Sequence, residues 1–140
     1  MKTYRLAAAA LTLLMLGTAS GQTYFADREC YRTANLDRGE KNFEANLKSS
    51  NEGVLESSLA LIGRIKLYYP ERAMTGIEKE IYQLSINGPS DRIRYKAYLV
   101  YNVFTNPAMF ASEAKTDFSN SDEMFTALAK RLQNNYLSVN

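Results

Sequence analysis

Apolar side chains recur at helical spacing along most of the chain, and no stretch shows the sustained alternation of a β-strand. The pattern is clearest over residues 51–68. The predicted inward positions of this helix and its end are Val54, Ser58, Leu61, Ile62, Ile65 and Tyr69. Leu55 and Leu59 widen the stripe, which predicts a helix that is buried on two sides. Pro70 ends the helix because proline lacks the amide hydrogen that a further turn needs.

Two capping-box sequences predict where further helices begin. Residues 37–40 (Asp-Arg-Gly-Glu) open a helix that runs through about Ser49. Residues 75–78 (Thr-Gly-Ile-Glu) open a second helix, and Gly88 and Pro89 end it. We therefore expect short helices over residues 40–49 and 77–86.

Polar residues followed by apolar stripes predict the remaining helices. Ser90 is expected to cap a helix through residue 104, with Ile93, Ala97, Val100, Tyr101 and Phe104 on its inner face. Asn106 and Pro107 suit the start of a short helix through Phe110. Ser119 or Ser121 is expected to cap the last helix. Its apolar face consists of Phe125, Leu128 and Leu132.

The two halves of residues 40–104 share an organisation in which a short helix, a polar turn and a longer helix follow one another. Placing Val54 on Ile93 gives a spacing of 39 residues between the copies. This pattern resembles the HEAT type of helical repeat, whose period is about 40 residues. Ile93-Arg94 is similar to the family's Val-Arg start of the second helix, whereas Val54-Leu55 departs from it by lacking the arginine.

The resemblance implies an all-α fold, a short stack of about three antiparallel helical hairpins that forms a HEAT-like α-α superhelix. Residues 107–134 would be the third unit or a cap. A non-repeat helical bundle is the alternative. Small exported bacterial proteins of this kind occur without an assigned function, so the resemblance implies no catalytic residues.

The chain opens with the pattern of a secretory signal peptide over residues 1–21. Lys2 and Arg5 give a basic start, an apolar run occupies residues 6–16, and small residues follow. A helical run of that length rises only about 16 Å, against roughly 30 Å of bilayer hydrocarbon. We expect cleavage after Ser20 or Gly21, export to the periplasm or the medium, and no membrane span in the mature chain.

Removal of the signal peptide changes the charge balance. The full chain carries 17 basic and 15 acidic residues, and both Lys2 and Arg5 are lost with the signal. The mature chain is therefore neutral and has no global attraction to nucleic acid, so no nucleic-acid partner is expected. Within it, residues 22–39 are predicted to form an N-terminal arm or loose helix, and residues 40–140 a single helical domain.

The chain has no histidine and one cysteine, Cys30, which excludes many catalytic and metal-binding arrangements. Histidine-dependent nucleophilic machinery, histidine-ligated metals, thiolate clusters and phosphate-binding glycine loops are all missing. We therefore expect no enzyme activity, no cofactor and no metal site. Cys30 could be buried, free and reactive, or paired between chains in an intermolecular disulfide that gives a homodimer.

One cluster combines basic and aromatic side chains: Arg92, Arg94, Tyr95, Lys96 and Tyr98. It could bind a protein partner, because arginine and tyrosine dominate binding hot spots. It could equally be the solvated flank of an amphipathic helix, with the tyrosines bordering the core. The sequence leaves both interpretations open.

Tyrosines concentrate in the middle of the chain, at Tyr68, Tyr69, Tyr82, Tyr95, Tyr98 and Tyr101. Their amphipathic rings suit an interface or the edge of a small core. Glu52 and Glu56 lie four apart near a predicted helix start, where acids interact favourably with the helix macrodipole. We interpret this pair as structural rather than as an acid–base couple.

These patterns favour a non-enzymatic, exported protein-interaction module of otherwise unknown molecular function. The alternative is a structural subunit of an envelope or surface assembly, in which Cys30 or the N-terminal arm joins neighbouring copies.

Overall fold

The computed structural model describes residues 33–138 and shows an all-α fold, as predicted. These residues form no strand. In chain order the elements are α1 (Thr33–Asn46), α2 (Glu52–Tyr68), α3 (Thr75–Asn87), α4 (Asp91–Thr105), the 3-10 turns η2 (Pro107–Phe110) and η3 (Glu113–Lys115), and α5 (Ser121–Ser138).

Side chains cap the starts of both central helices; the cap at Ser90 was predicted, and the one at Asn51 was not. The Asn51 side chain accepts hydrogen bonds from the amides of Gly53 and Val54, at 2.9 and 3.3 Å. The Ser90 hydroxyl accepts one from the amide of Ile93 at 3.3 Å. Each cap satisfies amides that the first helical turn leaves without partners and contributes about 1 kcal/mol.

Both predicted capping boxes are wrong. Residues 37–40 lie inside α1, which begins at Thr33, so the boundary expected between an arm and a domain falls within a helix. At α3 the residue before the helix is Met74, and no side chain caps it; Thr75 is already helical. The last helix is capped by Asn120, whose side chain accepts from the amide of Glu123 at 2.9 Å, rather than by Ser119 or Ser121.

The acids of the first box bind a distant cation instead. Arg72, in the turn between α2 and α3, donates to Asp37 and, at 2.8 Å, to Glu40. These hydrogen bonds raise the pKa of Arg72 above its ordinary value. They connect α1 to the turn that starts the second hairpin. The predicted signal peptide at residues 1–21 and Cys30 lie outside the described residues.

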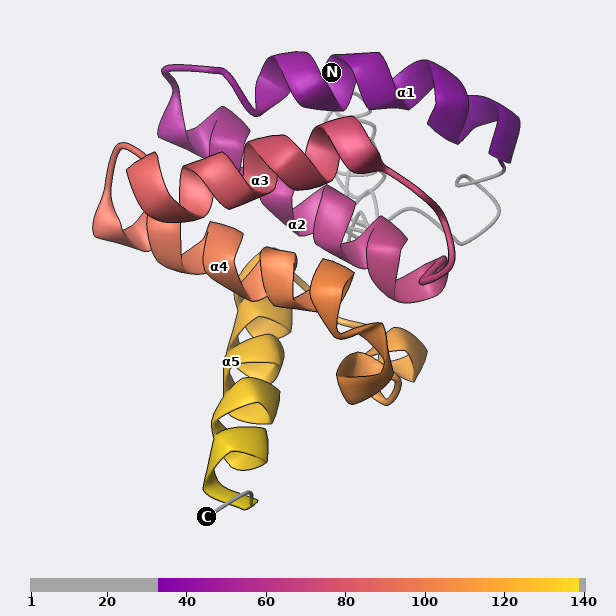
Figure 1. Ribbon diagram of the computed structural model, residues 1–140, viewed down its shortest axis with the longest axis vertical. Coiled ribbons are helices and arrows are strands. Elements are labelled where there is room, and N and C mark those ends of the chain that lie inside the picture. Colours follow the sequence, from indigo (N-terminus) through magenta and orange to yellow (C-terminus); the bar gives the residue numbers. More distant parts are fainter. Residues whose placement is uncertain (1–32, 139–140) are drawn as a thin grey trace, which may run out of the picture.

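Two helical hairpins form the main body of the molecule (Figure 1). α1 and α2 are antiparallel, as are α3 and α4, and the second hairpin lies beside the first with α3 along α1 and α4 along α2. α4 packs mainly on α3 and α2. The arrangement brings the starts of α2 and α4 to the same end of the molecule.

α2 is the most buried helix and is covered on two sides, as predicted. Leu55 is 1% exposed and Leu59 0%, but Val54 is 36% exposed. The inward stripe is thus rotated by one residue from the prediction at its start. Placing Val54 on Ile93, which is 0% exposed, therefore pairs an outward position with an inward one. The HEAT-like repeat itself stays a prediction.

α2 and α4 approach closely at Gly63. A Cβ atom built on Gly63 would lie 3.2 Å from Cγ2 of Val100, tighter than an ordinary carbon–carbon contact. The contact leaves no room for a methyl group, and a glycine at this position allows the two helices to pack side by side.

The C-terminal segment fits a cap better than a third hairpin. After α4 the chain makes η2 and η3 and then the single helix α5, which runs across α4 and projects away from the hairpins (Figure 1). Met124, Phe125, Leu128 and Leu132 bury the first part of α5. Tyr136 and Leu137, near its end, are 57% and 69% exposed. None of the described helices is both long enough and apolar enough to cross a bilayer.

Candidate protein-binding surface

The predicted basic–aromatic cluster divides between two sides of α4. Arg92 and Lys96 lie on the side that meets α2 and α5, where they pair with acids. Tyr95 and Tyr98 lie on the outer side, 53% and 37% exposed. Arg94 lies in the first turn of α4, and its side chain reaches back to Gly88 at the end of α3. The structure therefore does not gather the five residues into one patch.

The inner side of α4 carries a network of opposite charges. Arg92 pairs with Glu52 and Glu56, each at 3.2 Å, and the Ser90 hydroxyl donates to Glu52 at 3.0 Å. Lys96 pairs with Glu56 and, at 3.0 Å, with Asp122. Glu52 and Glu56 thus act as partners of α4 across the α2–α4 contact.

Lys96 is the most enclosed member of this network. Its side chain is 12% exposed, and its ammonium lies 4.6 Å from the centroid of the Phe125 ring. A desolvated ammonium interacts more strongly with a carboxylate and with an aromatic face than an exposed one does. Lys96 is therefore a joint between α2, α4 and α5 rather than an available cation.

Arg94 is also engaged within its own chain. It donates to the carbonyl oxygen of Gly88 at 2.7 Å and forms an ion pair with Asp91. Its guanidinium satisfies a carbonyl at the C-terminal end of α3, which leaves the end of that helix capped. A partner that recruited Arg94 would have to replace these contacts.

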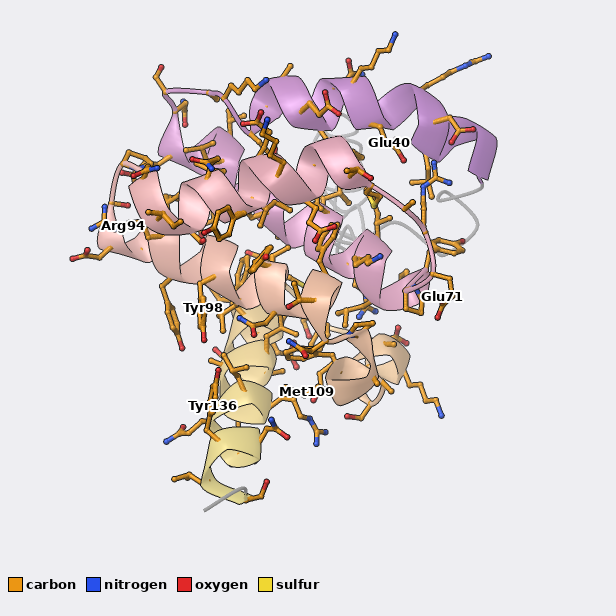
Figure 2. All side chains as sticks on the ribbon, viewed as in Figure 1. Glu40, Glu71, Arg94, Tyr98, Met109 and Tyr136 are labelled. Atoms are coloured by element: carbon orange, nitrogen blue, oxygen red, sulfur yellow. The ribbon has the colours of Figure 1, made fainter. Side chains whose placement is uncertain are left out.

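The outer side of α4 and the neighbouring helices present a row of tyrosines, here called the tyrosine surface: Tyr82, Tyr95, Tyr98, Tyr101 and Tyr136. The hydroxyls of Tyr98 and Tyr136 lie 3.4 Å apart and share a hydrogen bond between α4 and α5 (Figure 2). The rings of Tyr82 and Tyr101 have centroids 5.2 Å apart. The row thus spans α3, α4 and α5.

The central tyrosines divide between the two predicted settings, an exposed interface and the edge of the core. Tyr82 is 43% exposed, and Tyr95 and Tyr98 are exposed as well. Tyr68, Tyr69 and Tyr101 are partly buried and pack against the core. Some of the central tyrosines therefore border the core, and others face outward.

Tyr136 was not among the predicted surface residues, because the predicted apolar face of the last helix ended at Leu132. It lies four residues after Leu132, so extending the same stripe by one turn would have found it. The hydrogen bond with Tyr98 raises the pKa of Tyr136 above its ordinary value, because it favours the neutral phenol. Tyr136 therefore stays a neutral phenol at neutral pH, and its hydroxyl can bind a ligand.

The described residues hold no group of three or more acidic or cysteine side chains arranged to bind a metal ion. Comparison with family models, with curated proteins and with solved structures finds no match for this chain. Phenol rings with outward hydroxyls supply apolar contact area and hydrogen bonds together, a combination common at protein interfaces.

Proposed function

We propose that this chain is an exported, non-enzymatic protein-interaction module that binds its partner through the tyrosine surface. One observation carries the proposal. Tyr95, Tyr98 and Tyr136 are exposed on two helices that meet in a hydrogen bond, whereas the neighbouring cations Arg92 and Lys96 are held by acids of α2 and α5.

The energetics favour the aromatic residues over the basic ones. Tyrosine loses little conformational entropy on binding and is enriched among hot-spot residues. Recruiting Lys96 would leave Asp122 without its cation and Glu56 with Arg92 as its remaining cation. The HEAT-like resemblance supports the same function, since stacked helical hairpins commonly present extended binding surfaces.

A photo-crosslinking experiment tests the proposal. A benzophenone amino acid replaces Tyr95 in the full chain, and a second protein carries it at Lys79, an exposed residue of α3. Crosslinking in the native cell envelope, followed by mass spectrometry, should identify a partner captured from position 95 and not from position 79. Equal capture at both positions, or none at position 95, would contradict the proposal.

The identified partner then separates the aromatic from the basic interpretation. Tyr95→Ser and Tyr98→Ser should each weaken its binding by about 30-fold, as expected for a hot-spot residue. Lys79→Ser should leave binding unchanged. If Arg94→Glu weakens binding more than either tyrosine variant, recognition depends on charge and the tyrosine surface is not the site.

A structural subunit of an envelope or surface assembly is the second candidate. Leu137 and Tyr136, 69% and 57% exposed on the projecting part of α5, favour it, because two adjacent large side chains of this kind suit contact with a neighbouring copy. Crosslinks from position 95 to the same chain would support this function. Non-reducing gels of the exported protein test the further prediction of a dimer through Cys30, with Cys30→Ser as the control.

A further inference from the structure

A cavity of about 370 Å³ lies between the C-terminal end of α2 and the segment that follows α4. Leu67, Val103, Pro107, Phe110 and Ala111 give it largely apolar walls. Its volume is at the small end of the range of ligand pockets, roughly 300–1,000 Å³. The cavity is separate from the tyrosine surface, so its role does not depend on the proposed function.

One cation, Lys66, lines this apolar cavity. The residue is 7% exposed, and its ammonium donates a hydrogen bond to the carbonyl oxygen of Arg72 at 2.8 Å. The Phe104 ring centroid lies 5.1 Å from the same nitrogen. Among residues 33–138, no carboxylate lies within ion-pair distance of Lys66, in contrast to Lys96.

A buried ammonium in this position is costly to the fold. Burial lowers the pKa of Lys66, and the more distant charges of Glu78 and Glu71 oppose that effect only in part. An ammonium has three donors, and the carbonyl of Arg72 uses one. A buried charge of this kind is normally paired. The residue thus offers unused binding capacity to an anion in the cavity.

The surroundings limit the class of anion. Apolar walls favour a ligand with a hydrocarbon body, and one ammonium matches one negative charge. Glu71, which also lines the cavity, repels every anion, and it repels a ligand of higher charge such as a phosphate more strongly than a monocarboxylate. We propose that this cavity binds small apolar monocarboxylates, with the ammonium of Lys66 as the partner of the carboxylate and the walls around Val103 and Phe110 holding the hydrocarbon part.

Titration of the full exported chain with benzoate and with octanoate tests the proposal by amide chemical shifts. Both probes should shift the amides of residues 66–71 and 107–111 and saturate at a dissociation constant on the order of 1 mM, as expected for ligands of this size. Benzylamine, of similar shape but opposite charge, should leave these amides unchanged. Equal shifts with benzylamine, or no saturable shift with either acid, would overturn the proposal.

Two variants test separately what the Lys66 ammonium and the apolar walls contribute to binding. Lys66→Met keeps the length of the side chain and should weaken benzoate binding at least about 10-fold. It should not lower the melting temperature, because an apolar residue replaces a buried charge. Lys79→Met, an exposed lysine on α3, is the matched control and should bind as the unaltered chain does.

Ala111→Phe keeps Lys66 and fills the cavity from its exposed rim. It should abolish binding of both probes, and it decides the question even where Lys66→Met fails to fold. Undiminished binding in Ala111→Phe would place the ligand elsewhere and overturn the proposal.

Discussion

The two sides of α4 differ in their contacts, although their residues are interleaved in the sequence of one helix. On the inner side, Arg92 and Lys96 are neutralised by acids of α2 and α5. On the outer side, Tyr95 and Tyr98 are exposed and uncharged. The enclosed charge of Lys96 holds α2, α4 and α5 together, whereas Tyr95 and Tyr98 form part of the accessible surface.

Gly63→Leu should have the largest effect, because it disrupts the packing of α2 against the inner side of α4. The new side chain would meet Val100, because even a Cβ atom at Gly63 lies 3.2 Å from its Cγ2. We expect the free energy of unfolding, measured by urea denaturation, to fall by about 3 kcal/mol. Ser57→Leu, at an exposed position of the same helix, is the control and should cost less than about 0.5 kcal/mol. Equal effects would contradict a tight α2–α4 contact.

Lys96→Met should weaken the inner side by a smaller amount. It leaves the carboxylate of Glu56, 19% exposed, without its enclosed partner and also removes the contact with Asp122. We expect a loss of about 1–2 kcal/mol in the same measurement. Lys48→Met removes the pair with Glu80, in which the lysine side chain is 61% exposed, and should change stability by less than about 0.5 kcal/mol. If the two variants lower the free energy of unfolding equally, Lys96 does not hold α2, α4 and α5 together.

Tyr95→Ser on the outer side should leave stability within about 0.5 kcal/mol of the unaltered chain, because the ring is 53% exposed and covers little core. The expected loss concerns partner binding alone. A large fall in the free energy of unfolding would mean that the outer side is structural as well, and the contrast between the two sides would disappear.

Tyr98→Phe should produce the smallest effect, a change in titration. Without the Tyr98 hydroxyl as its hydrogen-bond partner, the pKa of Tyr136 should return toward its ordinary value of 10.0. The raised pKa favours the folded state below pH about 10, and this contribution is lost as the pH rises through the raised value. NMR of ring-labelled tyrosine measures the titration, and an unchanged Tyr136 curve would show that the pair does not form in solution.

Local signals predicted the helices well where the cap and the stripe belong to the same segment. Ser90 is an example, since its hydroxyl accepts a hydrogen bond from the amide of Ile93, three residues further along the chain. The predicted start of α1 was wrong because Asp37 and Glu40 do not form a capping box. They bind Arg72, which is 35 and 32 residues away, and a local pattern does not record such pairing. The all-α class follows from periodicity; the crosswise placement of α5 depends on tertiary packing.

The candidate surface was predicted only in part. Tyr95 and Tyr98 lie outside, but the pairing of Arg92 and Lys96 with Glu52 and Glu56 was not foreseen. The sequence does contain a signal for this pairing. Two acids lie four residues apart near the start of α2, and two bases lie four residues apart near the start of α4, which runs beside it. Recognising it required knowing that α2 and α4 are neighbours.

The joint at Lys96 also has a consequence for the order in which the molecule assembles. Its ammonium pairs with Glu56 of α2 and Asp122 of α5 at once, so the docking site of α5 exists only after α2 and α4 have met. We expect the contact between α3 and α4, neighbours in the chain, to form early and α5 to dock late. Native-state hydrogen exchange should accordingly show α5 opening at a lower free energy than α2, as a separate cooperative unit.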